Sequence, residues 1–266
     1  MAENKLPNVV VLIAHHNYQQ YLADAVQSAV SQTYPNIHVC IVDSSDSFEK
    51  TMEVLDGGEN KFATVFSSND ENLEDGFVDK ILSYDNISVI RLKGKPRGPS
   101  HNRNIGIAYS IDSADIYVIL DADDIMLPNK VSAVVEKFLE NPQEIGVVYA
   151  DTIVWNVVTG KQTREYREPY SLARLDVECI VHSGAAISKL ALQDVVEETG
   201  WYDNTMRTCE DFDLWSRIGE KYMIVHVPKA LTIVRVQPQN SSITVPTETW
   251  QKNWQRVQEK KSGRKK

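Results

Sequence analysis

The sequence has few cysteines, no long apolar run and no excess of basic charge, and each absence excludes a class of protein. Its three cysteines, Cys40, Cys179 and Cys209, are far apart and lack CxxC spacing, so we expect neither a disulfide framework nor a zinc site. No segment approaches the roughly 18 uninterrupted apolar residues of a membrane span, and the first residues, MAENKLPN, contain no signal-peptide core. We therefore expect a soluble, cytoplasmic protein.

Acidic charge is in excess and unevenly distributed. The formal net charge of -9 argues against a nucleic-acid-binding protein, because binding to the phosphate backbone needs concentrated Lys and Arg. Twelve acidic residues and only three lysines lie between Asp43 and Asn86. This block predicts an acidic insertion at the surface over about residues 45–86, which could serve as a lid, an acceptor contact or a partner site.

Short, β-branched apolar runs alternate with helical patterns along the chain. The runs cover residues 9–13, 37–42, 87–92, 116–120 and 145–150. Continuous runs of this length are typical of strands that are buried on both faces. Strands that alternate with helices indicate an α/β domain with a largely parallel sheet. Ligands of such sheets bind at the carboxyl ends of the strands.

Two amphipathic helices are expected between these runs. After Asn17, apolar residues recur with helical spacing at Leu22, Ala25, Val26, Ala29 and Val30. Pro128 is expected at the first position of a second helix. Its apolar side carries Val131, Val134, Val135, Phe138 and Leu139.

The densest acidic motif, DADD, follows the run 116–120 directly. Asp121, Asp123 and Asp124 lie within four positions, and carboxylates so close repel one another unless a cation lies among them. Mg²⁺ and Mn²⁺ prefer oxygen ligands and leave positions open for substrate phosphates, so the motif favours such an ion. The alternative is a helix cap ahead of Pro128, for which one Asp would suffice.

A second acidic cluster, TCEDFDLWSRI, begins at Thr208. Glu210 and Asp211 would lie at the start of a helix whose apolar side holds that start in place. A carboxylate there can act as a general base if an acceptor hydroxyl is within hydrogen-bond reach. The alternative is a capping box, in which Thr208 and Asp211 only begin the helix.

Polar groups are also expected near these acids. His15 and His16 follow the run 9–13, and Asp43 follows the run 37–42, so they should converge with Asp121 at one sheet edge. In KGKPRGPSHNRNIGIA, Arg97 and Arg103 could neutralise phosphates beside a metal ion. The alternative for this segment is a turn with solvated arginines.

Together these motifs resemble the inverting family-2 glycosyltransferases of GT-A fold. The resemblance spans about residues 8–236 and rests on the order of the first loop, VCIVDSSDS, GPSHNRNIGIA, VILDADDIMLP and GWYD with CEDFDLWSRI. It implies a Rossmann-like α/β/α sandwich around a mostly parallel sheet. A single domain would cover about residues 1–240, with a nucleotide-binding part to about 125 and an acceptor part from about 126.

The resemblance also implies roles for individual residues. Asp121 and Asp123 match the DXD motif that holds Mn²⁺ or Mg²⁺ against the donor diphosphate, with Asp124 as an adjacent acid. The nucleotide contacts implied are His15, Asn17, Asp43, Arg103 and Asn104; Arg97 remains a candidate from the basic segment alone. Asp211, beside Glu210, matches the general base that deprotonates the acceptor hydroxyl.

Three segments depart from the family pattern. His15 and His16 stand where the first loop usually reads Thr-Tyr, and Ser44 replaces a second Asp after Asp43, which weakens the inference of a uracil base. Gln237 stands where a His often follows the Arg of the C-terminal segment. If that His would bind the metal, its replacement predicts weaker ion binding, or a substitute such as His182.

The final segment, residues 241–266, is predicted to be a basic tail that can form a helix. Seven basic residues and one acid lie between Lys252 and Lys266, and Trp250, Trp254 and Val257 have helical spacing. We expect a helix that docks by this aromatic face and has a frayed basic end. Contact with an anionic membrane is the alternative, and would be the protein's only membrane contact.

The expected function is therefore metal-dependent, inverting transfer of a sugar from a nucleotide diphosphate sugar, with a UDP-sugar favoured. The acceptor would be a hydroxyl group of a glycan, a lipid-linked molecule or another compound, and the oligomeric state is open. A sugar-nucleotide pyrophosphorylase is a competing enzyme class, but it should have a glycine-rich loop where this sequence reads AHHNYQQ. A non-catalytic sugar-nucleotide-binding protein is the other alternative.

Overall fold

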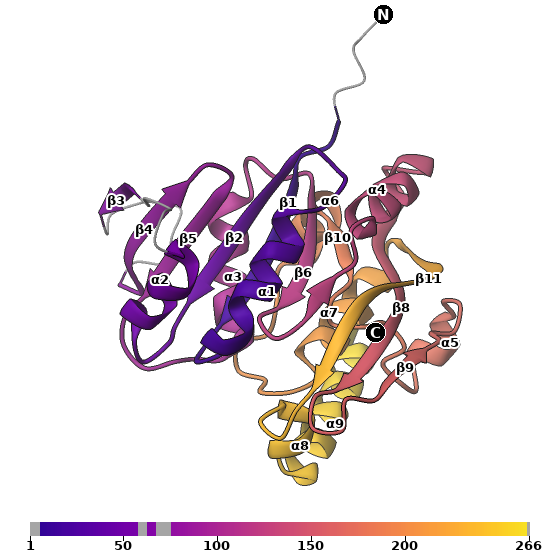
Figure 1. Cartoon of the computed structure of the whole chain (residues 1–266). Helices are drawn as coiled ribbons and strands as arrows, with labels where there is room; N and C mark the ends of the chain where they lie inside the picture. The colour runs from indigo at the N-terminus through magenta and orange to yellow at the C-terminus, as the bar shows by residue number, and fades with distance from the viewer. Residues whose placement is uncertain (1–5, 58–62, 68–75, 265–266) are drawn as a thin grey trace, which may run out of the picture.

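A mixed α/β fold with one large sheet forms the protein. The computed structural model describes residues 6–57, 63–67 and 76–264 (Figure 1). Residues 58–62 and 68–75 of the expected acidic insertion lie outside the described residues. No helix among those described is long and apolar enough to cross a membrane.

Strands and helices alternate through the first half of the chain. They are β1 (Val9–His15), α1 (Gln19–Val30), β2 (Ile37–Asp43), α2 (Phe48–Asp56), β3 (Ala63–Ser67), β4 (Val78–Tyr84), β5 (Ile87–Leu92), α3 (Pro99–Ser110) and β6 (Ile116–Asp121). The second half contains β7 (Ile125–Met126), α4 (Lys130–Glu140), β8 (Ile145–Asn156), β9 (Gln162–Glu165), α5 (Leu172–Leu175), β10 (Ala186–Ser188), α6 (Lys189–Val195), α7 (Glu210–Gly219), β11 (Met223–Val236), α8 (Ser241–Thr244) and α9 (Thr247–Arg264).

The sheet runs in the order β3-β4-β5-β2-β1-β6-β10-β8-β11-β7, with β9 paired to β8. Its central strands β5, β2, β1 and β6 are parallel, as are β8 and β11. Antiparallel β4 extends one side, and antiparallel β10 joins β6 to β8. All five expected strands are present, and the predicted α/β/α sandwich around a mostly parallel sheet is confirmed.

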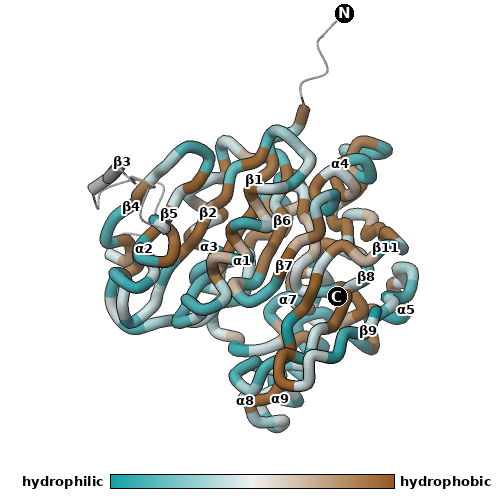
Figure 2. Tube along the Cα trace, viewed as in Figure 1, coloured by the Kyte–Doolittle hydropathy of each residue, from teal (hydrophilic) through white to brown (hydrophobic). Residues whose placement is uncertain are grey.

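Helices cover both faces of the sheet, which explains why its central strands are mostly apolar. Val9, Val11 and Ile13 of β1 pack with α1, α2 and α4, whereas Val10 and Leu12 pack with α3, α6 and α7. Successive side chains of a strand point to opposite faces, so every residue of such a strand is buried. Figure 2 shows the hydrophobic colours concentrated along these strands.

Helix α1 has the predicted stripe, but α4 differs from the prediction. It begins at Lys130, so Pro128 lies in the preceding turn, where its carbonyl accepts a hydrogen bond from the Thr33 backbone. The Lys130 backbone donates to the Leu127 carbonyl and closes that turn. Leu139 is 54% exposed, because only four of the five predicted apolar positions face the sheet.

The described parts of the acidic segment belong to the main fold. Helix α2 contacts α1, and β4 pairs with β5 and buries Ile81 and Leu82. These parts are therefore integrated into the sheet and its helical layer, rather than forming a separate surface segment.

The C-terminal segment is helical and docked, as predicted, but its contact face is different. Val257 is fully buried and Trp250 packs against the core, whereas Trp254 is 41% exposed. The buried face runs through Asn253, Val257 and Lys261, spaced four apart. The expectation of a frayed basic end was wrong for the described part, because the helix continues to Arg264 and its cations Arg256, Lys260, Lys261 and Arg264 are paired with acids.

Candidate active site

The parallel register of β2, β1 and β6 brings three polar strand ends together. His15 lies opposite Asp43, and Ala14 lies opposite Asp121. The predicted convergence at the carboxyl edge of the sheet is therefore found. Helix α3, which precedes β6, and helix α7 bring further charged side chains to this edge.

Arg103 of α3 connects the two acidic motifs. Its Nη2 donates to Oδ1 of Asp121 at 2.8 Å, and its Nη1 donates to Oε1 of Glu210 at 3.0 Å. The other Asp121 oxygen accepts a hydrogen bond from the Ser183 hydroxyl. Burial would raise the pKa of Asp121, but the charge and hydrogen bond of Arg103 outweigh it, so the pKa lies below its usual value.

Asp123 is held by two side-chain amides. Gln237 and Asn240 both donate to its Oδ2 at 3.0 Å, and Asp123 is 8% exposed. Burial and the charge of Asp121 raise its pKa. The residue that replaces the expected His therefore contacts the DXD motif itself.

Asp124 is buried and contacts β11. Its Oδ1 accepts a hydrogen bond from the Arg235 backbone in β11, which fixes the turn after β6 against that strand. Burial, followed by the charges of Asp121 and Asp123, raises its pKa well above the usual value. Asp123 and Asp124 therefore do not cap α4, which excludes the capping alternative.

Asp43 and His15 lie beneath the surface of this edge. Asp43 is fully buried, with one oxygen bound to Arg91 at 2.9 Å and the other to the Ser45 backbone at 3.0 Å. The His15 ring is also fully buried, with Nε2 3.8 Å from Asp43 and 3.4 Å from the Thr51 hydroxyl. Burial lowers the pKa of His15 to about 4, against the opposing effect of Asp43.

The two remaining nucleotide-site candidates lie nearer the surface. Asn17, with a φ of 58°, joins the first loop to the next through a two-way hydrogen bond of its side chain with Asp46. Arg97 is exposed, and its guanidinium lies 4.0 Å from the ring centroid of Phe77. Arg97 thus makes no recorded contact with the acidic motif.

The start of α7 places Glu210 and Asp211 beside Arg103. Cys209 precedes the helix with a φ of 61° and makes no side-chain cap, so the capping-box alternative is not what forms this turn. Burial, with the charge of Asp211, raises the pKa of Glu210 to about 7. Burial also raises the pKa of Asp211, which remains partly exposed and hydrogen-bonds the Phe212 backbone at 2.8 Å.

Asn104, beside Arg103, fixes the GWYD segment. Its amide oxygen accepts from the Tyr202 backbone at 2.9 Å and its amide nitrogen donates to the Tyr202 carbonyl at 2.8 Å. The Arg103 guanidinium consequently lies 5.2 Å from the Tyr202 ring centroid. Two consecutive residues of α3 thus join the sheet edge to the segment before α7.

The acids at this edge fit a hard divalent cation that takes most of its ligands from a substrate. Within the described residues, no group of three or more His, Cys, Asp or Glu side chains is arranged to hold a metal ion. Asp123 nevertheless offers Oδ1, while the amides on Oδ2 orient the carboxylate. Asp121 could contribute Oδ2, which accepts a hydrogen bond from Ser183, while Oδ1 stays bonded to Arg103. His182, the proposed substitute ligand, accepts a hydrogen bond from the Gly184 backbone.

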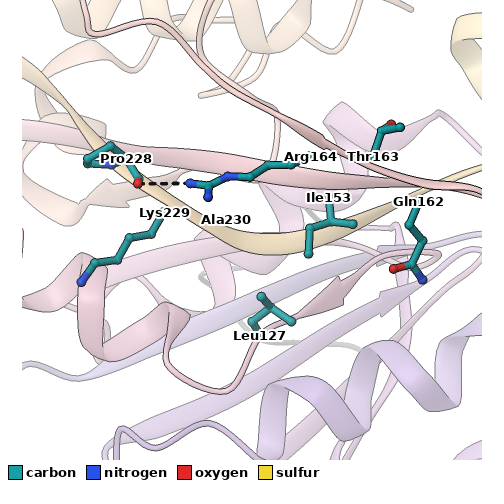
Figure 3. A pocket seen from close by; sticks show the side chains of 8 residues that line it. All are labelled: Leu127, Ile153, Gln162, Thr163, Arg164, Pro228, Lys229 and Ala230. Atoms are coloured by element: carbon teal, nitrogen blue, oxygen red, sulfur yellow. Dashed lines mark hydrogen bonds between the residues drawn. The ribbon is translucent and has the colours of Figure 1, made fainter.

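The cavities found lie away from these acids. One of about 490 Å³ lies over β7, β8, β9 and β11, where Arg164 donates to the Pro228 carbonyl (Figure 3). Another of about 470 Å³ lies between α9 and the segment around Arg207. The candidate site is therefore described by its charged side chains.

Several residues of this edge were missed by sequence reasoning. Tyr18 lies near both DXD acids: burial, followed by the charges of Asp123 and Asp121, raises its pKa to about 12. Its position directly after Asn17 was a usable signal. The sequence contains no such signal for Ser183 and Asn240, because each contacts the DXD motif from a segment more than 60 positions away.

The fold and the arrangement of these acids define a GT-A glycosyltransferase-type domain, and comparisons agree. The model of glycosyl transferase family 2 matches residues 53–199. The chain belongs to this family.

Curated relatives are distant and longer. An uncharacterized glycosyltransferase of Nostoc sp. is 26% identical over 144 residues, which are 53% of this chain and 35% of the relative. Hyaluronan synthase of Pasteurella multocida is 24% identical over 233 residues, or 85% of this chain and 20% of that protein. A Rickettsia prowazekii relative, also an uncharacterized glycosyltransferase, is 22% identical and covers 79% of this chain. The chain spans at most 58% of the length of these relatives.

Solved structures support the fold. Residues 1–349 of S. aureus TarS in complex with UDP match with a TM-score of 0.63 at 16% identity. The match covers 87% of this chain and 61% of the TarS chain. The same TarS segment in complex with UDP-GlcNAc matches with a TM-score of 0.62 at 15% identity.

Proposed function

We propose that this chain is the catalytic domain of a metal-dependent, inverting glycosyltransferase that uses a nucleotide diphosphate sugar, with a UDP-sugar as the first donor to test. One observation carries the proposal. The DXD acids at the end of β6 and a separate partly exposed carboxylate, Asp211, belong to one edge and are linked through Arg103 and Glu210. A single displacement needs both a site for the leaving diphosphate and a base for the acceptor.

The donor would lie across the carboxyl ends of β1, β2 and β6. Asp123, together with Asp121, would hold Mn²⁺ or Mg²⁺ against the diphosphate, and that ion would offset the negative charge of the leaving group. Arg97 and Asn17 are the accessible candidates for contact with the nucleotide. His15 and Asp43 are fully buried, so we propose that they support the nucleotide loop from below.

The acceptor would approach Asp211 from the opposite side of the sugar. Its hydroxyl proton passes to the Asp211 carboxylate as the acceptor oxygen bonds to the anomeric carbon. The bond from that carbon to the diphosphate oxygen breaks, and the electron pair leaves with the nucleoside diphosphate. The raised pKa of Asp211 makes it a stronger base than an ordinary Asp.

The acceptor is a hydroxyl group of a glycan or of a lipid-linked or other compound. We propose one domain over about residues 1–240, with the nucleotide-binding part to about 125 and the acceptor part after it. Helices α8 and α9 then form a docked C-terminal segment. Because α9 is held by ion pairs to the acceptor part, we propose that it stabilises that part rather than binding membrane.

A calorimetric titration with UDP and UDP-sugars, with and without Mn²⁺, tests the donor site. We expect the wild type to bind UDP and UDP-sugars in a Mn²⁺-dependent manner. Asp123→Asn should lose this binding. Asp211→Asn should still bind the donor but should no longer transfer the sugar. Affinity that does not change in Asp123→Asn would overturn the metal role, and turnover in Asp211→Asn would reassign the base.

The same titrations separate the competing classes. A pyrophosphorylase would bind a nucleoside triphosphate and a sugar phosphate and would release pyrophosphate. A binding protein would take up the sugar nucleotide but would neither transfer nor hydrolyse the sugar over hours.

A further inference from the structure

Arg103 joins two acids that have separate tasks in the proposed reaction. It lies in the second turn of α3, is 3% exposed, and extends one Nη to Asp121 and the other to Glu210. A guanidinium is a rigid planar fork, so the distance between its two bonded carboxylates is fixed by its own geometry. Displacement of one carboxylate therefore shifts the guanidinium and alters its hydrogen bond with the other carboxylate.

The surroundings of Arg103 leave it little freedom. Its guanidinium lies over the Tyr202 ring, and Asn104 holds the Tyr202 backbone in place. Its Nε is buried and has no hydrogen-bond partner within the described residues. The two carboxylates are thus the hydrogen-bond partners recorded for its side chain.

Charge balance makes this link functional. Arg103 donates to Oδ1 of Asp121, and Ser183 donates to Oδ2. A divalent cation bound to Asp121 would withdraw negative charge from that carboxylate and weaken its attraction for Arg103, so Glu210 would become the stronger of the two partners of Arg103. Glu210 is the first residue of α7, and Asp211 is the second, so the position of Arg103 sets where this first turn lies.

We propose that Arg103 is a positioning residue that couples donor binding at Asp121 to the arrangement of the acceptor-side carboxylates at the start of α7. This inference rests on the proposed function. Glu210 stabilises the donor-bound state because its hydrogen bond with Arg103 strengthens when the cation binds at Asp121. By linkage, donor binding and the acceptor-side arrangement influence one another by equal factors.

A double-mutant cycle read by UDP binding tests the coupling without knowledge of the acceptor. The variants are Glu210→Gln, Arg103→Lys and the double variant, each titrated with UDP at saturating Mn²⁺ and again without Mn²⁺. We expect Glu210→Gln to weaken Mn²⁺-dependent UDP binding about fivefold or more. In the Arg103→Lys background the same change should alter affinity less than about twofold, because an ammonium lacks the fork that joins both acids.

The matched control is Glu220→Gln. It makes the same charge change at the other end of α7, where Glu220 pairs with Arg264. We expect UDP affinity to stay within about twofold of the wild type, since removal of one exposed charge contributes little at this distance.

The outcomes distinguish the two proposals. If the wild-type chain does not bind UDP with Mn²⁺, the proposed function fails. If it binds, but the effects of the two substitutions multiply, the coupling is refuted and the function stands. If Arg103→Lys does not fold, the test rests on Glu210→Gln alone. A UDP affinity of Glu210→Gln equal to that of Glu220→Gln would contradict the coupling.

Discussion

Gln237 donates a hydrogen bond from its side-chain amide to Oδ2 of Asp123 at 3.0 Å, and it is 2% exposed. The amide holds one carboxylate oxygen, so the other is left for a ligand. Gln237 directly follows β11, more than 100 positions after Asp123. It stands where the resemblance places a His, and its role would be to orient a ligand of the ion rather than to be one.

Replacement of Gln237 by Ala should weaken Mn²⁺ binding in the presence of UDP by about tenfold, because loss of an orienting partner of a metal ligand has this order of effect. Manganese affinity can be measured by titration calorimetry or by electron paramagnetic resonance of free Mn²⁺. Gln239→Ala is the control, since Gln239 is exposed and only its backbone carbonyl meets Tyr18. Equal affinities for the two variants would contradict the role of Gln237.

His15 should make the fold less stable in mild acid. Burial lowers its pKa from 6.5 to about 4, with Asp43 opposing and His16 assisting the shift. Between pH 6.5 and about pH 4, the His15 imidazole is protonated in the unfolded chain but neutral in the folded chain. The free energy of unfolding therefore decreases as the pH falls through this range. Between pH 7 and 5 this amounts to about 2 kcal/mol.

Urea unfolding at pH 7 and pH 5 measures this effect. The wild type should lose about 2 kcal/mol more than His15→Gln over that interval, because the Gln side chain does not titrate. Other buried groups, including His182, titrate in both proteins and cancel in the comparison. An equal loss in the two proteins would show that His15 is protonated in the folded state.

The strand–helix alternation and the acidic strand end were predictable because they depend on local patterns. A strand buried on both faces must be apolar throughout, and the acids that follow it are adjacent in sequence. The five strands and the convergence of His15, Asp43 and Asp121 follow from this. The position of Pro128 was not predictable, because a turn closed by the Leu127 carbonyl delays the helix by two residues.

The contacts that assemble the site could not be read from the sequence. Ser183, Gln237 and Asn240 reach the DXD acids from later segments, and no local pattern links residues so far apart. The contact of Asp124 was equally hidden: adjacency suggested a third ligand, and the structure adds that Oδ1 of Asp124 accepts a hydrogen bond from the Arg235 backbone of β11. The exposed Trp254 likewise reflects a helix rotation that depends on which side meets α7.

Lys260 should be important for the docking of α9. Its ammonium contacts Asp203 at 3.2 Å and Asp213 at 3.0 Å, and both acids are buried. Lys260→Met should lower the free energy of unfolding by about 2 kcal/mol, because buried carboxylates lose a partner while Lys260 itself is partly exposed. Lys252→Met is the control, since Lys252 lies on the exposed side of α9. Chemical denaturation of both variants gives the comparison, and equal values would show that the ion pairs add nothing.

Gly106 should be required for close packing of α3 on β1. A Cβ added there would lie 2.2 Å from Cδ1 of Leu12 and 3.1 Å from Cγ2 of Val42, and both side chains are fully buried. Gly106→Ala should therefore lower the free energy of unfolding by about 2 kcal/mol, as overpacking in a core does. Because α3 also carries Arg103, UDP affinity should fall with it.

Gly263→Ala is the matched control: a Cβ there meets nothing within 4 Å, and an Ala in this helix should leave stability equal or raise it by up to about 1 kcal/mol. Urea unfolding distinguishes the two, and a Gly106→Ala variant as stable as Gly263→Ala would show that α3 can shift away from the sheet without cost.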